Sequence, residues 1–342
     1  MRHVLQIVPR LRPSVCGVGD YAVSIAQEMR KRHGIETRFL VGDPAWSHGS
    51  EVEGFAVDRV SDRTSGALAA AVRRSECEAV IVQYSAYGFQ KRGAPLWLVR
   101  GLATARHPQV LAMFHELYAT GPVCSSAFWL SPLMRWIARR LAELSKYVYV
   151  SRAAAARWLG GDNITVLPIF SSLGEIECPA PLRQRPNHLA LFAYQAGTNA
   201  WYWERLRRTI EVLKPDQVIA LGRSPDVVGA ACGDVPVACT GILPVEDVAK
   251  HLAACRYGYL SYPPDFLGKS SILAAFAGNA LATILADDAI KLPEGLELGR
   301  HLIAASRLSA GTDLDAASRH LAAWYHQHDR RATTQAFVER LP

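Results

Sequence analysis

The chain has 342 residues, of which 50% are hydrophobic and 20% charged, a composition typical of a globular protein long enough for two domains. Its 38 Lys and Arg residues outnumber 31 Asp and Glu, and the net charge of +7 favours an acidic partner such as a nucleotide diphosphate, an anionic membrane surface or a nucleic acid. Because no apolar run reaches about 18 residues and the first residues enter a strand pattern directly, we expect a cytoplasmic protein without a membrane span or secretory leader.

Apolar runs of strand length alternate with helical patterns along the chain, which predicts parallel sheets covered by helices on both faces. We therefore expect an α/β protein with two doubly wound Rossmann-like domains facing a cleft, and ligands at the carboxyl ends of the strands. Residues 1–170 and 188–342 form the expected domains, and the proline-rich segment 171–187 is the expected linker. The expected strands are 3–8, 37–41, 79–83, 110–115, 147–150 and 165–168, followed by 189–193, 217–221, 235–239, 257–261, 281–285 and 301–304.

A loop with two glycines follows the first expected strand. Gly17 and Gly19 let the backbone approach a ligand closely, and the helix that follows offers its first amides to an anion. The dinucleotide fingerprint is incomplete, because Val23 stands at the third glycine position. A tight turn with Asp20 as helix cap explains the same residues, so both interpretations stay open.

The expected strand at 110–115 ends in His115, and Glu116 follows. A histidine beside a glutamate at a strand end can act as a general base on a hydroxyl, or bind a sugar or phosphate. The alternative is a histidine that only closes the strand by bonding to a loop carbonyl.

Residues 128–141 predict a helix with an aromatic and a basic side, a pattern typical of helices that lie on an anionic membrane. In the alternative interpretation Leu133, Trp136 and Leu141 belong to the core, and the arginines are solvated or pair with phosphate. The residues that carry the membrane interpretation are Trp129, Leu133, Trp136, Arg135, Arg139 and Arg140.

Two loops of the second half offer phosphate-binding groups. Gly197 and Thr198 provide an amide and a hydroxyl, and Arg223 provides a guanidinium that can bind a diphosphate through two parallel hydrogen bonds. A later turn, residues 240–247, contains Leu243 and also has the proline and acidic residues of a helix start.

Residues 257–285 predict a strand, a proline-containing turn, a helix of small residues and a second strand. Gly268 ends the turn, and Ser270 or Ser271 can cap the helix. Lys269 adds a full positive charge beside the helix N-terminus, so the segment suits a phosphate or diphosphate. An ordinary βαβ unit with a solvated lysine is the alternative.

The order of elements over 257–285 resembles the donor-binding segment of GT-B glycosyltransferases similar to families four and one. Cys-Gly-Val-Gly-Asp-Tyr-Ala at 16–22 resembles the first loop of many bacterial members, and similar enzymes carry a His followed by an acid at the strand end that His115 occupies here. The resemblance implies transfer of a sugar from a nucleotide-sugar donor to a glycan or lipid-linked hydroxyl acceptor, in polysaccharide or glycan assembly. It also implies that the last residues, 337–341, cross back onto the first domain.

The resemblance implies a set of site residues. His115 is the expected catalytic residue, with Glu116 and Asp20 in reserve, and the backbone near Leu243 is expected to contact the nucleotide base. The expected donor-binding residues are Gly17, Gly19, Gly197, Thr198, Arg223, Leu243, Gly268, Lys269, Ser270 and Ser271. We expect no cofactor and no metal, since no D-x-D motif ends a strand and the seven cysteines lack a C-x-x-C pair. The cysteines are expected to be reduced thiols.

Retaining members carry two glutamates in the donor segment, and here Phe266 and Ala274 fall at those positions, with Asp265 the nearest acid. A non-catalytic partner or scaffold of the same fold is therefore the main alternative, and a sugar epimerase of this fold is a weaker one. Nucleic acid is not expected as a partner, because the basic residues are spread through both halves and no recognised module is present. Because of the helix at 128–141, we also expect an anionic surface at the inner face of the membrane as a partner.

Overall fold

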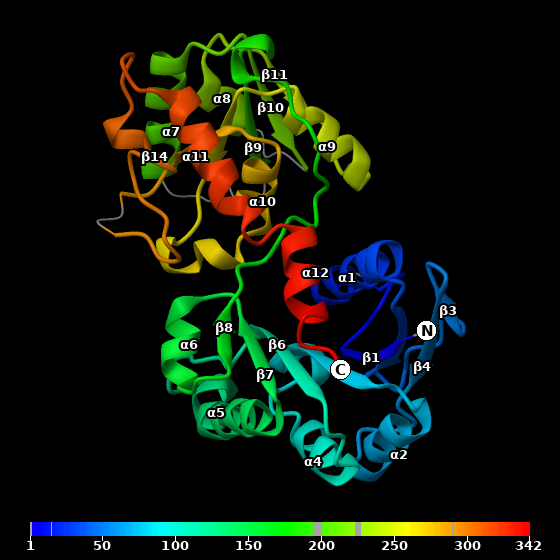
Figure 1. The fold of residues 1–342 in the computed structure, drawn as a ribbon. Coiled ribbons are helices and arrows are strands. Elements are labelled where there is room, and N and C mark those ends of the chain that lie inside the picture. Colours follow the sequence, from blue (N-terminus) through cyan, green and yellow to red (C-terminus); the bar gives the residue numbers. More distant parts are fainter. Residues whose placement is uncertain (1, 15, 194–199, 223–226, 289–290) are drawn as a thin grey trace. The chain divides into compact units, whose positions relative to one another are not determined.

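In the computed structural model, the described residues are 2–14, 16–193, 200–222, 227–288 and 291–342 (Figure 1). The chain divides into two compact units, Met1–Leu167 with Thr333–Pro342, and Pro168–Ala332. The segment 171–187, expected as a linker, lies within the second unit. There the buried Arg185 donates hydrogen bonds from Nη1 to the carbonyls of Cys255 (3.1 Å) and Asn279 (2.8 Å), which fixes the segment to the unit.

The described part of the first unit contains an 8-stranded sheet in the order β3-β4-β2-β1-β5-β6-β7-β8. All neighbouring strands are parallel except β3 and β4, which form an antiparallel pair. β3 and β4 were not among the expected strands, because they are short and many of their residues are exposed. The strands are β1 (His3–Val8), β2 (Glu36–Val41), β3 (Glu51–Val52), β4 (Phe55–Arg59), β5 (Ala79–Ser85), β6 (Val110–Glu116), β7 (Tyr147–Val150) and β8 (Ile164–Val166).

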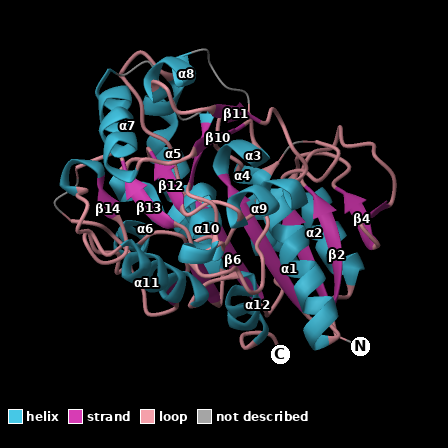
Figure 2. Ribbon diagram, turned by 90° about the horizontal axis from the view of Figure 1, so that it is seen from above, coloured by secondary structure: helices cyan, strands magenta, loops and turns pink. Residues whose placement is uncertain are grey.

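Helices cover both faces of this sheet, as the apolar strands require. Helix α1 packs against β1 and β2, and it lies beside β2 in Figure 2. Helices α2 and α4 pack against each other. Alternate residues of β1 serve the two faces: Leu5 and Ile7 belong to one apolar cluster, and Val8 belongs to the cluster that includes residues of α1. The helices are α1 (Gly17–His33), α2 (Ser65–Ser75), α3 (Ala86–Phe89), α4 (Leu96–Ala105), α5 (Ser126–Leu144) and α6 (Ala153–Leu159).

The C-terminal tail forms two helices, α11 (Leu314–His326) and α12 (Arg330–Val338). The end of α12 packs on β7 of the first unit. The Tyr149 hydroxyl donates a hydrogen bond to the Ala336 carbonyl (2.6 Å), and the rings of Tyr149 and Phe337 lie 4.5 Å apart. Phe337 is fully buried there.

The described part of the second unit contains a 6-stranded parallel sheet in the order β11-β10-β9-β12-β13-β14. Its strands are β9 (His188–Phe192), β10 (Gln217–Leu221), β11 (Val237–Cys239), β12 (Tyr257–Leu260), β13 (Ala282–Leu285) and β14 (Ile303–Ala304). Its helices, besides α11, are α7 (Ala200–Leu213), α8 (Val227–Cys232), α9 (Val245–Ala253) and α10 (Ser271–Gly278), with 3₁₀ turns at Leu182–Gln184, Pro264–Lys269 and Ala305–Arg307.

Each sheet has a point at which the direction of strand addition reverses. In the first unit the chain builds outward from β1 through β2 and β4, then returns to add β5 to β8 on the other side of β1. In the second unit the reversal lies between β9 and β12. Loops that leave neighbouring strands at such a point diverge over opposite faces of the sheet, and ligands of open α/β sheets bind there.

Candidate functional site

His115 lies at the carboxyl edge of the first sheet, one strand away from the reversal point. Tyr84 of β5 pairs with Phe114 of β6, but Ser85 pairs with Glu116, so His115 is the extra residue of a β-bulge. Bulges change the direction of a side chain at a strand end and are common beside active sites. The sequence predicts the strand end but not the bulge, because the bulge depends on how β6 pairs with β5.

The His115 ring contacts a polar side chain of β5 and an aromatic side chain of α1. Its Nε2 lies 3.0 Å from Gln83 Oε1, and the Tyr21 ring of α1 stands edge-on at 4.8 Å. Gln83 Nε2 in turn donates to Gln6 Oε1 (2.9 Å), and Gln6 Nε2 donates to the Ala22 carbonyl (3.3 Å). Both glutamines are fully buried. Neither glutamine was among the predicted site residues, although a glutamine inside a strand of Val, Ile and Leu residues is the pattern that marks such a pair.

Glu116 follows His115 in sequence but bonds to a different strand. Its Oε2 accepts a hydrogen bond from the Ser85 hydroxyl at 3.0 Å, across the bulge. The nearby Tyr84 is buried, and burial, with the Glu116 charge, raises the pKa of its phenol above the usual value. The described contacts thus give Glu116 a role in fixing the end of β5.

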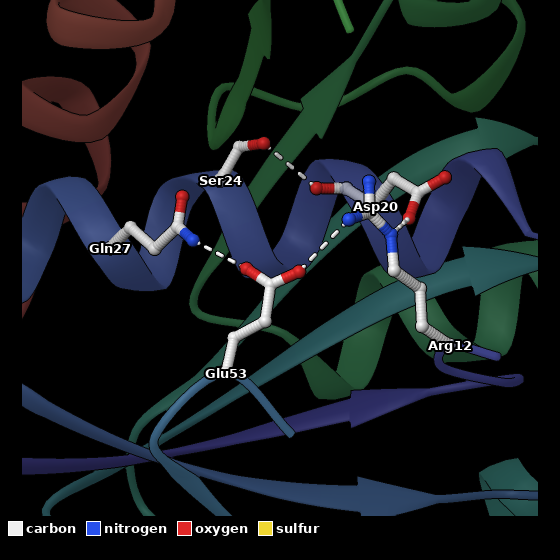
Figure 3. A network of polar contacts seen from close by, with 5 residues as sticks. All are labelled: Arg12, Asp20, Ser24, Gln27 and Glu53. Carbon is white, nitrogen blue, oxygen red and sulfur yellow. Dashed lines mark hydrogen bonds and ion pairs between the residues drawn. The ribbon is translucent and has the colours of Figure 1, made fainter. Parts of the chain in front are cut away.

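Asp20 belongs to a polar network on the first turn of α1 (Figure 3). Arg12 Nε lies 2.8 Å from Asp20 Oδ1, and Arg12 Nη1 lies 3.0 Å from Glu53 Oε1. Gln27 Nε2 donates a hydrogen bond to the other carboxylate oxygen of Glu53, Oε2, at 2.5 Å. The network joins α1 to the turn between β3 and β4. Asp20 does not cap α1, as one interpretation of the sequence had it, because Cys16 occupies the N-cap position.

The two glycines of the first loop differ in what they permit. A Cβ on Gly19 would lie 2.3 Å from the Arg10 carbonyl oxygen, so Gly19 is required by the chain's own backbone. A Cβ on Gly17 would meet nothing within 4 Å. Beside this loop lies an open cavity of about 530 Å³, lined by Arg12, Pro13, Ser14, Asp20, His48, Glu51 and Val52.

In the second unit, strand register brings several loops to one edge. Leu191 pairs with Tyr259 and Phe192 with Leu221, so the loops after β9, β10 and β12 begin side by side. The amide of Gly222 donates to the Gly241 carbonyl (3.1 Å), which joins the loops after β10 and β11. Of the predicted donor residues on this edge, Gly197, Thr198 and Arg223 lie outside the described residues.

The turn after β12 ends at the N-terminus of α10. Ser270 caps that helix: its hydroxyl accepts a hydrogen bond from the Leu273 amide at 3.1 Å, and the residue is buried. Gly268 is also buried, and its carbonyl accepts from the Ile169 amide at 3.0 Å. Lys269 and Ser271 are partly exposed. Ser270 and Gly268 therefore shape the turn, whereas Lys269 and Ser271 are accessible to a ligand.

The remaining predicted residue, Leu243, lies in the turn after β11 and is partly exposed. Its neighbour Ile242 has an exposed fraction of 77%. Pro244 is the N-cap of α9, so the segment also has the helix-start role that the sequence allowed. Within the described ranges, no group of three or more His, Cys, Asp or Glu side chains could hold a metal ion, and all seven cysteines are described and free.

Helix α5 carries an exposed apolar surface, which we call the α5 aromatic face: Phe128, Trp129, Leu133 and Trp136. Trp129 and Trp136 have exposed fractions of 69% and 50%. The alternative that placed Leu133 and Trp136 in the core is therefore wrong, although Leu141 is buried. Two arginines of α5 lie over aromatic rings, Arg135 over Tyr118 (4.5 Å) and Arg139 over Trp158 (4.7 Å). None of the helices in the described residues is long and apolar enough to span a membrane.

Comparison with known proteins identifies the fold. No protein-family model and no curated protein sequence matches the chain. Among solved structures, the pneumococcal O-GlcNAc transferase GtfA in complex with UDP and GlcNAc is similar, with a TM-score of 0.65, 8% identity and coverage of 99% of this chain and 98% of that chain. Anabaena HepE in complex with UDP-glucose has a TM-score of 0.61, 12% identity and coverage of 99% of both chains. An α-glucosyltransferase in complex with UDP-glucose and DNA has a TM-score of 0.56, 11% identity and coverage of 99% of both chains.

These similarities extend over nearly the full length of each chain and include both units. The protein therefore has the GT-B fold of two Rossmann-like domains, as the sequence predicted.

Proposed function

We propose that the protein is a glycosyltransferase that moves a sugar from a nucleotide diphosphate sugar to a hydroxyl acceptor. The observation that carries the proposal is the reversal point of the second sheet, between β9 and β12, because the turn that follows β12 leads to Lys269 and to the capped start of α10. Solved proteins with this fold contain UDP or a UDP-sugar. We assign the same class of donor to this edge of the second unit.

The chemistry of the leaving group explains this choice of residues. When the bond between the sugar and the diphosphate breaks, negative charge builds up on the diphosphate oxygens. Lys269 supplies a positive charge, and the first amides of α10 point toward a ligand at the helix N-terminus, where the helix dipole favours an anion. Groups already oriented toward the developing charge stabilise it without reorganisation. Arg223, outside the described residues, is the proposed second cation.

The first unit is the proposed acceptor domain. The acceptor hydroxyl must lose its proton as the new glycosidic bond forms, and a neutral imidazole can accept a proton near pH 7. His115, at the bulged end of β6, is the proposed base. Asp20, which forms an ion pair with Arg12, is the reserve candidate.

The proposed acceptor is a glycan or a lipid-linked hydroxyl, and the α5 aromatic face supports a lipid-linked one. A helix that exposes two tryptophans and carries several arginines binds an anionic interface through apolar burial and charge attraction. We therefore propose peripheral association with an anionic membrane surface.

Calorimetric titration with UDP-, GDP- and dTDP-sugars tests the proposed donor class. At least one nucleotide sugar should bind and stabilise the protein, by about 2.7 kcal/mol at a concentration 100 times its Kd. The free sugar lacks the diphosphate and should not bind detectably. If no nucleotide sugar binds, the proposal fails. Steeply salt-dependent retention of random DNA would indicate a nucleic-acid partner instead.

A non-catalytic protein of the same fold is the second candidate function. It is favoured by Phe266, exposed in the turn before α10, and by Ala274, buried within that helix, which occupy the positions of two acids in similar retaining enzymes. The two candidates differ in turnover. A nucleotide sugar that binds but is neither hydrolysed nor transferred to any tested acceptor would favour the non-catalytic candidate.

A further inference from the structure

A buried chain of side-chain amides links His115 to the backbone of α1. It runs from the His115 ring through Gln83 and Gln6 to the carbonyl of Ala22, so it connects β6, β5, β1 and α1 in that order. β1 and β5 are the two strands at the reversal point of this sheet. We call this chain the glutamine relay.

The direction of the hydrogen bonds in the relay is fixed at one end. The Ala22 carbonyl can only accept, so Gln6 must present its NH₂ group to it (3.3 Å). Gln6 Oε1 then faces Gln83, whose NH₂ group donates to it (2.9 Å). Gln83 Oε1 is left to face the imidazole, and because an amide oxygen can only accept, His115 Nε2 must donate (3.0 Å).

Reversal of either amide is strongly disfavoured. It would place two amide oxygens or two NH₂ groups against each other at hydrogen-bond distance. Gln6 and Gln83 have exposed fractions of 0%, so bulk water cannot take over the lost hydrogen bonds. One buried hydrogen bond of ordinary strength already favours the observed direction by about fivefold, and an unsatisfied buried group adds to that.

We propose that Gln6 and Gln83 are positioning residues, which hold neutral His115 in the tautomer protonated at Nε2 and so make Nδ1 the atom that meets the substrate. The tautomer follows from the relay alone, whereas the use of Nδ1 as base depends on the proposed function. In that step the acceptor O–H bond breaks, its proton forms a bond to Nδ1, and the acceptor oxygen attacks the sugar carbon as the diphosphate departs with the bonding pair.

The relay suits a base because it stays neutral while the ring changes charge. When Nδ1 takes the proton, Nε2–H still donates to Gln83 Oε1, and no second proton has to move. Tyr21 packs against the ring from α1, and burial raises the pKa of its phenol, so it is neutral at physiological pH. On the ring's own strand, the Glu116 carboxylate accepts a hydrogen bond from Ser85.

Nitrogen NMR of the full chain labelled with ¹⁵N-histidine tests the tautomer directly, because protonated and unprotonated ring nitrogens have well-separated shifts. A His115→Gln variant identifies the His115 signals. Without any substrate, at a pH where the ring is neutral, we expect Nε2 protonated and Nδ1 unprotonated. Protonation at Nδ1 in the unmodified protein would overturn the proposal, whatever the variants do.

Two variants test the relay. Gln83→Met removes the oxygen that accepts the hydrogen bond from His115 Nε2. Gln6→Met removes the partner of the Gln83 NH₂ group, so the Gln83 amide can reverse. Both should shift the ratio of His115 tautomers by about fivefold, the worth of one hydrogen bond. The control is Gln335→Met on α12, whose exposed amide bonds to Glu339, and it should leave the His115 signals unchanged. Unchanged His115 signals in folded Gln6→Met protein would overturn the relay.

A kinetic measurement separates this proposal from the proposed function. If the protein transfers sugar, Gln6→Met should lower kcat while KM for the donor stays within about twofold, because only the correct tautomer can act as base. If no transfer is found with any donor, the proposed function fails, but the NMR result still decides the relay. Normal kcat in a variant with an altered tautomer ratio would overturn the role of Nδ1.

Discussion

Replacing Trp129 by Ser should weaken binding to anionic vesicles. The side chain has an exposed fraction of 69%. A tryptophan buries up to about 250 Å², so roughly 170 Å² can leave water, worth about 4 kcal/mol at ~25 cal/mol per Å². A helix lying in the interface buries only one side of each ring, so we expect about half of this, a loss of about 2 kcal/mol or roughly 30-fold in affinity.

Co-sedimentation with vesicles measures this loss. Vesicles of anionic and neutral lipid are compared at low and high salt, because arginine attraction to an anionic surface is screened within about 8 Å at physiological ionic strength. The matched control is Trp201→Ser on α7 of the second unit, where the exposed fraction is 38%. This variant should bind vesicles as the unmodified protein does.

Three results would refute the proposed role of the α5 aromatic face. Trp129→Ser could bind as tightly as the unmodified protein, or Trp201→Ser could lose as much. Equal binding to neutral and anionic vesicles would remove the role of the arginines. Either of the first two results would leave the exposed tryptophans without a membrane function.

Three further predictions concern the site and the tail. His115→Ala should lower transfer by about 10²–10⁴-fold with donor affinity nearly kept, whereas a fall in donor affinity measured by calorimetry would make His115 a binding residue. Lys269→Ala should weaken nucleotide diphosphate binding by about 1.5–3 kcal/mol. The control Lys91→Ala removes the same charge from an exposed residue of the first unit and should not weaken binding. Equal affinities of the two variants would show that Lys269 makes no contact with the donor. Burial lowers the pKa of His328 from 6.5 to about 4. The neutral ring therefore contributes fully to the free energy of unfolding above pH 6.5. This contribution, about 3 kcal/mol, is lost as the pH falls toward 4. Urea unfolding between pH 7 and 4 should show this loss in the unmodified protein and not in His328→Phe, and the same pH dependence in both would contradict it.

The strands of both sheets could be predicted from the sequence because parallel strands buried on both faces are continuous apolar runs. β1, β7 and β10 begin and end at the predicted residues. β3 and β4, at one side of the first sheet, could not be found in this way, since a short strand with many exposed residues has no such run. Yet β3 and β4 bring Glu53 to Arg12, and with it the network around Asp20.

The surface of α5 shows what a helical pattern leaves undecided. Residues 126–144 have an apolar side and a second side with tryptophans and arginines, and the sequence allowed either burial or exposure of Trp136. Packing decided it, because Met134, Ile137, Ala138 and Leu141 already fill the space against the sheet. Trp136 is left half exposed.

The sequence by itself determined the fold class, the two halves, the strand end that holds His115 and the helix start beside Lys269, because strand and helix periods depend only on residues close together in the chain. It could not determine what these side chains touch. The bulge at His115 requires the register of β5 against β6, and the glutamine relay requires β1, β5 and α1 to meet at one reversal point. Hydrogen bonds act over about 3 Å between residues that lie up to 77 positions apart in the chain, so only the tertiary structure brings these residues together.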